Sequence, residues 1–193
     1  MEIILDKLLS KKIAVCGSNE ILSDFVNSTS EQIGFEIGKR NGILLCGGMG
    51  GVMEAASRGA KKSNGITVGI LPTLNKTDSN SFTDIIIPTS LGKLRNFLIV
   101  NLADVVIGIA GSWGTLSELS MAMNLNKKVI LLANTGGVVD LLINSEFKIS
   151  SNTFFIAKDV NTAIDEAFFS HSLSEDEDFE CGIFCSGSQG KSF

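Results

Sequence analysis

The chain has 193 residues, of which 44% are hydrophobic and 20 are glycine, and its formal net charge is −5. A chain of this length buries about 70% of the surface that its unfolded form exposes, so we expect one hydrophobic core. The sequence has no basic cluster suited to a nucleic-acid backbone and no apolar run near the ~20 residues that span a bilayer, which excludes nucleic acid and membrane as partners.

Short apolar runs rich in β-branched residues recur along the chain and predict buried strands, and segments with helical spacing lie between most of them. In chain order, the predicted strands are 13–16, 43–46, 66–71, 84–87, 105–109, 129–132 and 154–157, and the predicted helices are 31–40, 52–62, 93–102, 116–125 and 161–169. This alternation requires parallel pairing with long crossovers. The predicted fold class is therefore α/β, a single Rossmann-like doubly wound domain with a mostly parallel sheet and helices on both faces.

Local signals set the expected boundaries. Ser28 and Glu31 form a capping box that predicts the start of the first helix, and Gly42 suits the end of that helix. The polar stretch 74–83 predicts a surface loop that could overhang a site. We predict an N-terminal extension at 1–11, the nucleotide-binding domain at 12–170, and at 171–193 a flexible tail that carries −4 of the net charge.

The cysteine and histidine pattern predicts no metal site. Cys16, Cys46, Cys181 and Cys185 show no C-x-x-C spacing, and the first two end apolar runs, so we interpret them as reduced thiols. The one histidine, His171, has no cysteine nearby to share a metal ion. No lysine lies in a glycine loop, so chemistry dependent on pyridoxal phosphate is not expected.

Three glycine-rich loops each follow a predicted strand and precede a helix. They are the first loop (16–18, with Gly17 and Ser18), the second loop (47–54, with Gly47, Gly48, Gly50, Gly51 and Glu54) and the third loop (111–115, Gly111, Ser112, Trp113, Gly114 and Thr115). Glycine lets the backbone approach a ligand closely, and the helix N terminus favours an anion, so phosphate is the predicted occupant. For any single loop, the alternative is a tight turn without a ligand.

None of the loops is a P-loop, because no Gly-Lys-Ser/Thr sequence follows, and the second loop matches the dinucleotide fingerprint only loosely. A P-loop ATPase or a dehydrogenase is therefore not predicted. Met49 and Trp113 occupy the variable centres of the two larger loops. Either side chain could cover a flat ring of a ligand or fill the core.

Three further motifs belong together: Arg95-Asn96, Ala103-Asp104 and the run from Gly111 to Glu118. Together they resemble the LOG family, once described as lysine decarboxylases and now associated with phosphoribohydrolase activity on cytokinin nucleotides. Within the family hallmark P-G-G-x-G-T-x-x-E, this chain keeps Gly111, Gly114, Thr115 and Glu118, while Ala110 replaces the proline and Ser112 the second glycine. The second loop and Arg58-Gly59-Ala60 look closer to a sister group that includes molybdenum cofactor carrier proteins.

The resemblance implies that Arg95 and Glu118 are the catalytic pair, because the family uses an arginine and the motif glutamate. A carboxylate near the sugar can stabilise an oxocarbenium-like transition state or activate water. Two structural alternatives remain open: Thr115 and Glu118 also form a capping box, and Arg95 could be a surface arginine paired with a carboxylate.

Two further residues have mainly structural interpretations. Glu54 and Arg58 stand four residues apart on one predicted helix, and an ion pair between them is favoured over shared ligand contact. Asp104 is expected to order its turn by bonding to backbone.

The leading hypothesis is a cytoplasmic LOG-like protein that binds a phosphorylated, nucleotide-like small molecule on residues 111–115 and cleaves nucleoside 5′-monophosphates to base and ribose 5-phosphate. It requires no cofactor. The alternative is a non-catalytic carrier of a molybdopterin-type ligand or a nucleotide sensor, which the departures at Ala110 and Ser112 favour. The resemblance also implies a homo-oligomer, for which the apolar helix 96–102 offers an interface.

Overall fold

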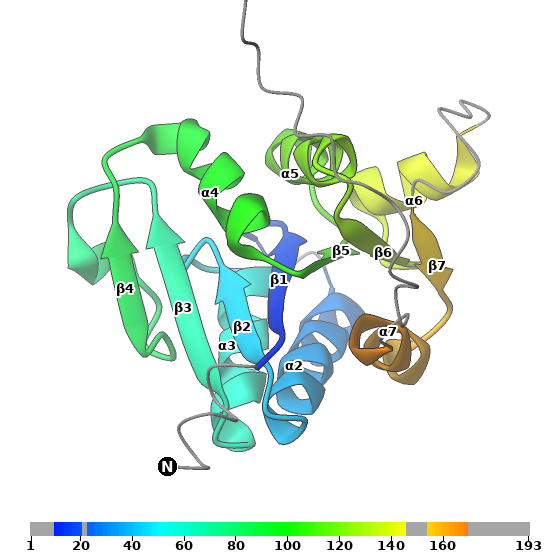
Figure 1. The fold of residues 1–193 in the computed structure, drawn as a ribbon, viewed down its shortest axis with the longest axis horizontal. Helices are drawn as coiled ribbons and strands as arrows, with labels where there is room; N and C mark the ends of the chain where they lie inside the picture. Colours follow the sequence, from blue (N-terminus) through cyan, green and yellow to red (C-terminus); the bar gives the residue numbers. More distant parts are fainter. Residues whose placement is uncertain (1–9, 21–22, 146–153, 170–193) are drawn as a thin grey trace, which may run out of the picture.

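The computed structural model describes residues 10–20, 23–145 and 154–169. Seven strands form one fully parallel sheet in the order β4-β3-β2-β1-β5-β6-β7 (Figure 1). The strands are β1 (Lys12–Gly17), β2 (Ile43–Cys46), β3 (Ile66–Leu71), β4 (Ile85–Pro88), β5 (Val105–Ile109), β6 (Lys128–Leu132) and β7 (Phe155–Ala157). The predicted fold class is confirmed. The strand order reverses between β1 and β5, so the ligand crevice of such a sheet is expected at their carboxyl ends.

Helices cover both faces of the sheet (Figure 1). They are α2 (Asp24–Lys39), α3 (Val52–Lys62), α4 (Arg95–Leu102), α5 (Trp113–Asn124), α6 (Gly137–Asn144) and α7 (Val160–Phe168), with 3-10 turns η1 (Lys76–Asp78) and η2 (Gly92–Leu94). One core layer packs α2, α3 and α7 on the sheet, and a second layer packs α4, α5 and α6. Cys46 faces the first layer and Cys16 the second.

The first helix starts earlier than predicted. Its N-cap is Ser23, whose Oγ accepts the Val26 N–H at 3.2 Å, so the predicted capping box is wrong. Ser28 lies inside α2, where its hydroxyl donates to the Phe25 carbonyl. At the other end, Asn41 takes the left-handed conformation (φ 58°) that was expected of Gly42. Asparagine tolerates this conformation because its short side chain bonds locally.

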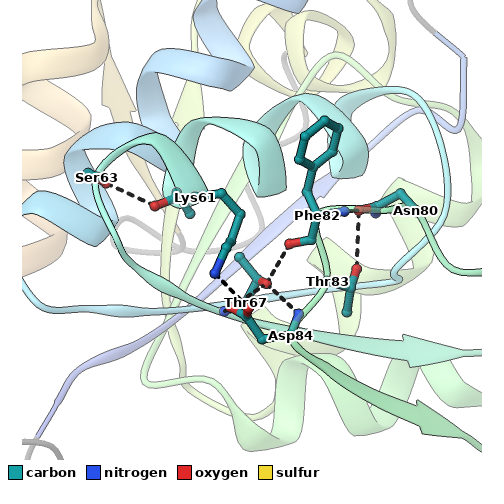
Figure 2. Close-up of polar contacts among 8 residues, drawn as sticks. Lys61, Ser63, Thr67, Asn80, Phe82, Thr83 and Asp84 are labelled. Atoms are coloured by element: carbon teal, nitrogen blue, oxygen red, sulfur yellow. Dashed lines mark hydrogen bonds and ion pairs between the residues drawn. The ribbon is translucent and has the colours of Figure 1, made fainter.

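The polar stretch 74–83 is a surface loop, as predicted, and it is tied to the second loop. The Asn80 N–H donates to the Gly48 carbonyl at 2.8 Å, and the Asn80 amide donates to the Met49 carbonyl at 2.9 Å. Figure 2 shows how the following residues anchor the loop: Asp84 accepts from both the hydroxyl and the N–H of Thr67 and pairs with Lys61 at 2.6 Å. These bonds fix the backbone of the surface loop against the second loop and β3.

Cys16 and Cys46 are buried free thiols, as predicted. Cys181, Cys185, His171 and the acidic tail lie outside the described residues. Asp104 bonds to backbone as expected, because its Oδ2 accepts the Lys12 N–H at 2.8 Å. Among the helices in the described part of the chain, none is both long enough and apolar enough to cross a membrane.

Candidate functional site

The third loop is fixed by hydrogen bonds between its backbone and the region that begins α6. The Val138 and Val139 N–H groups of α6 donate to the Gly111 and Ala110 carbonyls at 3.0 and 3.1 Å, and the Ala110 N–H donates to the Thr135 hydroxyl at 2.8 Å. The N-cap of α5 is Ser112, which makes no side-chain capping bond. Among the described residues, no acceptor faces the N–H groups of residues 112–115. The first turn of α5 therefore offers its N–H groups and dipole to an anion.

The backbone of this loop requires unusual angles. Gly111 has φ 90°, and a Cβ there would collide with the Thr115 side chain. Ala110 has φ 50°, a value that the ring of proline forbids. The alanine that replaces the proline of the LOG hallmark thus follows a different backbone path.

Arg95 and Glu118 meet beside this turn. Arg95 begins α4 and Glu118 lies in α5, and their residues are only 8% and 7% exposed. The Arg95 Nη1 group lies 3.3 Å from Glu118 Oε1 and 3.0 Å from Asn96 Oδ1. The Arg95 Nε–H group is buried without a hydrogen-bond partner among the described residues. The prediction that Arg95 could be a surface arginine is wrong. Arg95 does pair with a carboxylate, that of Glu118, but both residues are buried.

Two contacts bind this pair to the glycine loops. The Asn96 amide donates to the Gly114 carbonyl at 3.3 Å, which joins α4 to the first turn of α5. On the other side, a Cβ on Gly47 would collide with the Arg95 guanidinium, so the second loop packs directly on that group. Asn96, which the sequence analysis named only as part of the Arg95-Asn96 motif, is thus a residue that contacts both Arg95 and the third loop.

The burial of Glu118 determines its electrostatics. Loss of hydration raises the pKa of Glu118 to about 7, while the positive charge of Arg95 acts to lower it. Glu118 is not a capping residue, because α5 begins at Trp113 and Thr115 lies inside the helix. The capping-box alternative is therefore wrong. A carboxyl group with this pKa can take up or release a proton near neutral pH.

The first and second loops bind each other. The Val52 N–H at the start of α3 donates to the Ser18 carbonyl at 2.9 Å, and the Gly50 N–H donates to Asn19 Oδ1 at 3.2 Å. A Cβ on Gly51, at φ 63°, would collide with the Ser18 carbonyl. Close packing between the two loops thus explains why glycine is needed here. A ligand-binding role for the first two loops stays a prediction.

Three other predicted residues are placed as follows. Arg58 donates to Glu31 of α2 at 2.7 Å rather than to Glu54, so the predicted pair within α3 is wrong. Trp113 is 84% exposed, which excludes the core-filling alternative for its ring. Met49, in contrast, packs against the buried core.

A separate cleft of about 230 Å³ lies elsewhere along the sheet. It is lined by parts of α2, by the end of β6 and the residue after it, and by the turn before α7 and the first residues of α7: Phe25, Thr29, Gln32, Leu132, Ala133, Lys158, Asp159, Val160 and Asn161. None of the predicted site residues lines it. We place the candidate site at Arg95, Glu118 and the third loop, because the buried charges converge there.

Known proteins resemble this chain in sequence and structure. The molybdenum cofactor binding protein of Rippkaea orientalis is 36% identical, with a TM-score of 0.73 over 81% of this chain and 94% of that one. The molybdenum cofactor carrier protein of Chlamydomonas reinhardtii is 29% identical, with a TM-score of 0.71 over 80% and 94%. An uncharacterized protein of Archaeoglobus fulgidus is 38% identical over 121 residues, which cover 63% of this chain and 79% of that protein.

The resemblance drawn from the motifs is confirmed, including the likeness to molybdenum cofactor carrier proteins. The model of the SLOG cluster4 family, a LOG-like family, matches residues 10–164. This chain belongs to the SLOG cluster4 family.

Proposed function

We propose that this protein is a carrier that binds a phosphorylated heterocycle of the molybdopterin type, with the phosphate on the first turn of α5 next to Arg95. The observation that carries the proposal is the buried Arg95 guanidinium, whose Nε–H has no partner within the described residues. An unsatisfied buried donor costs about 1–3 kcal/mol. An anion that accepts from Arg95 and from the open turn of α5 would offset this cost.

Two further observations support a carrier. The solved structures that resemble this chain include a protein described as binding the molybdenum cofactor and one described as carrying it. In addition, Ala110 at φ 50° replaces the hallmark proline, so the loop on which LOG enzymes hold their phosphate has a changed backbone here. Trp113, exposed at the rim of the loop, offers a flat surface to the ring system of such a ligand.

The second candidate is hydrolysis of nucleoside 5′-monophosphates, and Glu118 is the observation that favours it. Its carboxyl group, with a pKa of about 7, lies 3.3 Å from Arg95. In its ionised form, Glu118 would accept a proton from the attacking water while the bond between C1′ and the base nitrogen breaks. The base nitrogen then takes up a proton, so the products are free base and ribose 5-phosphate.

We also propose that the chain self-associates through α4. Leu94, Phe97 and Leu102 on and next to this helix are each at least 44% exposed. An exposed apolar strip of this kind is typical of a protein interface. Because Arg95 begins the same helix, association would lie close to the site.

The test is one ligand panel with two measurements. Isothermal titration with molybdenum cofactor, molybdopterin and nucleoside 5′-monophosphates measures binding, and chromatography of the same mixtures measures release of free base. A carrier binds the pterin ligands without releasing base. Release of base that Glu118→Gln abolishes would favour the hydrolase, and binding of no member of the panel would contradict both candidates.

A further inference from the structure

The cleft between α2 and α7 is separate from the site at Arg95 and the third loop. It has a volume of about 230 Å³ and lies at the carboxyl end of β6. The two helices lie side by side in the core layer opposite the one that contains α4 and α5 (Figure 1). They are joined where Arg40, the C-cap of α2, pairs with Asp165 of α7, and the cleft opens nearer their N-terminal ends. Neither proposed function uses it.

The lining of the cleft combines apolar surface with a few polar side chains. Leu132 and Val160 are buried, and Phe25 is 56% exposed. The side-chain amides of Gln32 and Asn161 can each donate and accept hydrogen bonds. Pockets for small molecules have this composition, and those for drug-sized ligands measure roughly 300–1,000 Å³. A cleft of about 230 Å³ therefore suits a smaller molecule.

Thr29 is a buried polar residue of this lining whose hydroxyl group is unused. The residue is 7% exposed, and among the described residues its hydroxyl has no hydrogen-bond partner. The hydroxyls on either side of it along α2 behave differently, because Ser28 donates to the Phe25 carbonyl and Ser30 to the Val26 carbonyl. Thr29 thus retains a donor and an acceptor at the cleft for a bound molecule.

The charges around the cleft disfavour an anion. Asp159 is the N-cap of α7, and its Oδ1 accepts the Thr162 N–H at 2.8 Å, so a carboxylate already occupies this helix end. Lys158 is the other charged residue of the lining, and the two formal charges cancel. A phosphate at the start of α7 would face the Asp159 carboxylate. The lining therefore favours an uncharged ligand.

We propose that this cleft binds the purine ring of an uncharged base or nucleoside, stacked on Phe25 and hydrogen-bonded to Thr29. A purine has flat faces that stack on an aromatic side chain, and its edge carries both donors and acceptors. The Thr29 hydroxyl and the Gln32 and Asn161 amides match such an edge. The inference goes beyond the proposed function, because it concerns another face of the sheet and a ligand without phosphate.

Isothermal titration of the full chain with adenine, adenosine and guanosine measures this binding and separates the free base from the nucleosides. Thr29→Val removes the hydroxyl and keeps the shape, so Kd rises about 2- to 12-fold. Phe25→Ala removes the stacking surface, so Kd rises roughly 5- to 150-fold. Ser30→Ala and Phe35→Ala are matched controls on α2 outside the lining, and they leave Kd unchanged.

Amide NMR with the tightest of the three probes locates the site. We expect shifts at residues 29, 32 and 133, with residues 112–115 unchanged. Binding of none of the probes, a wild-type Kd in either cleft variant, or an equal loss in the controls overturns the proposal. Shifts confined to residues 112–115 also overturn it. A failure of the proposed function appears separately, as absence of binding by the phosphorylated ligands of the panel, and does not alter this titration.

Discussion

The second and third loops have similar sequences, but the structure uses them differently. Before α3, the Val52 N–H is bound by the Ser18 carbonyl and the Gly50 N–H by Asn19, so the first loop occupies part of this helix end. Before α5, the hydrogen bonds go to the carbonyl groups of the loop: the N–H groups of α6 donate to the carbonyls of Ala110 and Gly111. Glycine content alone therefore does not identify an anion site. The anion site that we propose is the start of α5, where the described residues supply no acceptor to the N–H groups of residues 112–115.

Substitution of one glycine in each loop should show the largest difference. Gly51→Ala forces a Cβ at φ 63° against the Ser18 carbonyl, and we expect it to lower the free energy of unfolding by ~2–4 kcal/mol. Gly114→Ala meets nothing within 4 Å and lies in a helix, so it should change stability by less than ~1 kcal/mol. Urea denaturation measures both. Equal destabilisation by the two changes would contradict the comparison.

The pH dependence of stability tests the burial of Glu118 beside the third loop. Its pKa rises on folding from 4.5 to about 7, so between these values the folded state binds a proton that the unfolded state lacks. The contribution is fully present below pH 4.5 and is lost as pH rises to about 7, amounting to at most about 3 kcal/mol. Glu118→Gln should lose less stability across this range in urea denaturation at pH 5 and pH 8. A variant with the wild-type pH dependence would show that Glu118 is not its source.

Removal of Arg95 should weaken binding at the third loop. Arg95→Ala deletes a charged donor to the phosphate, which corresponds to ~1.5–3 kcal/mol, or roughly 10- to 150-fold in Kd. Isothermal titration with the tightest ligand of the panel measures the change. Arg40→Ala is the matched control. Arg40 is the C-cap of α2, where it makes an exposed ion pair with Asp165 of α7. A similar loss in both variants would place the phosphate elsewhere.

Substitution of Trp113 should have the smallest effect of these changes, and it should affect ligand binding and not stability. Because Trp113 is 84% exposed, Trp113→Ala should change the free energy of unfolding by less than ~0.5 kcal/mol. Loss of stacking on a flat ligand should cost about 1 kcal/mol of affinity. Tryptophan fluorescence quenching on ligand addition provides an independent measurement, since the chain has one tryptophan. Absence of quenching would show that the ring does not touch the ligand.

Much of the fold could be predicted because buried parallel strands are continuous apolar runs. Three strands, β2, β3 and β5, begin and end at the predicted residues. Helix α6 was not predicted. Its start depends in part on a tertiary bond, from the Val138 N–H to the Gly111 carbonyl of the third loop, and in part on local bonds in which Asp140 accepts from Gly136 and Asn134. A signal was present in Gly136-Gly137 followed by apolar residues at helical spacing.

The candidate site was predicted in part, from the family resemblance. The resemblance indicated Arg95 and Glu118, and the structure brings them together, but it does so in a buried pair with an unpartnered Nε–H. The contact of Gly47 with the guanidinium and the bond from the Asn96 amide to the Gly114 carbonyl join residues far apart in sequence. No contiguous motif records such contacts, so they could not be found without the fold.

We propose that phosphate binds the first turn of α5 and not that of α3. Backbone amide NMR of the full chain, titrated with the tightest ligand of the panel and with inorganic phosphate, tests it directly. We expect the largest shifts at the amides of residues 112–115, with those of residues 50–53 little changed. Shifts confined to residues 50–53, or absent from both turns at saturating ligand, would contradict the claim.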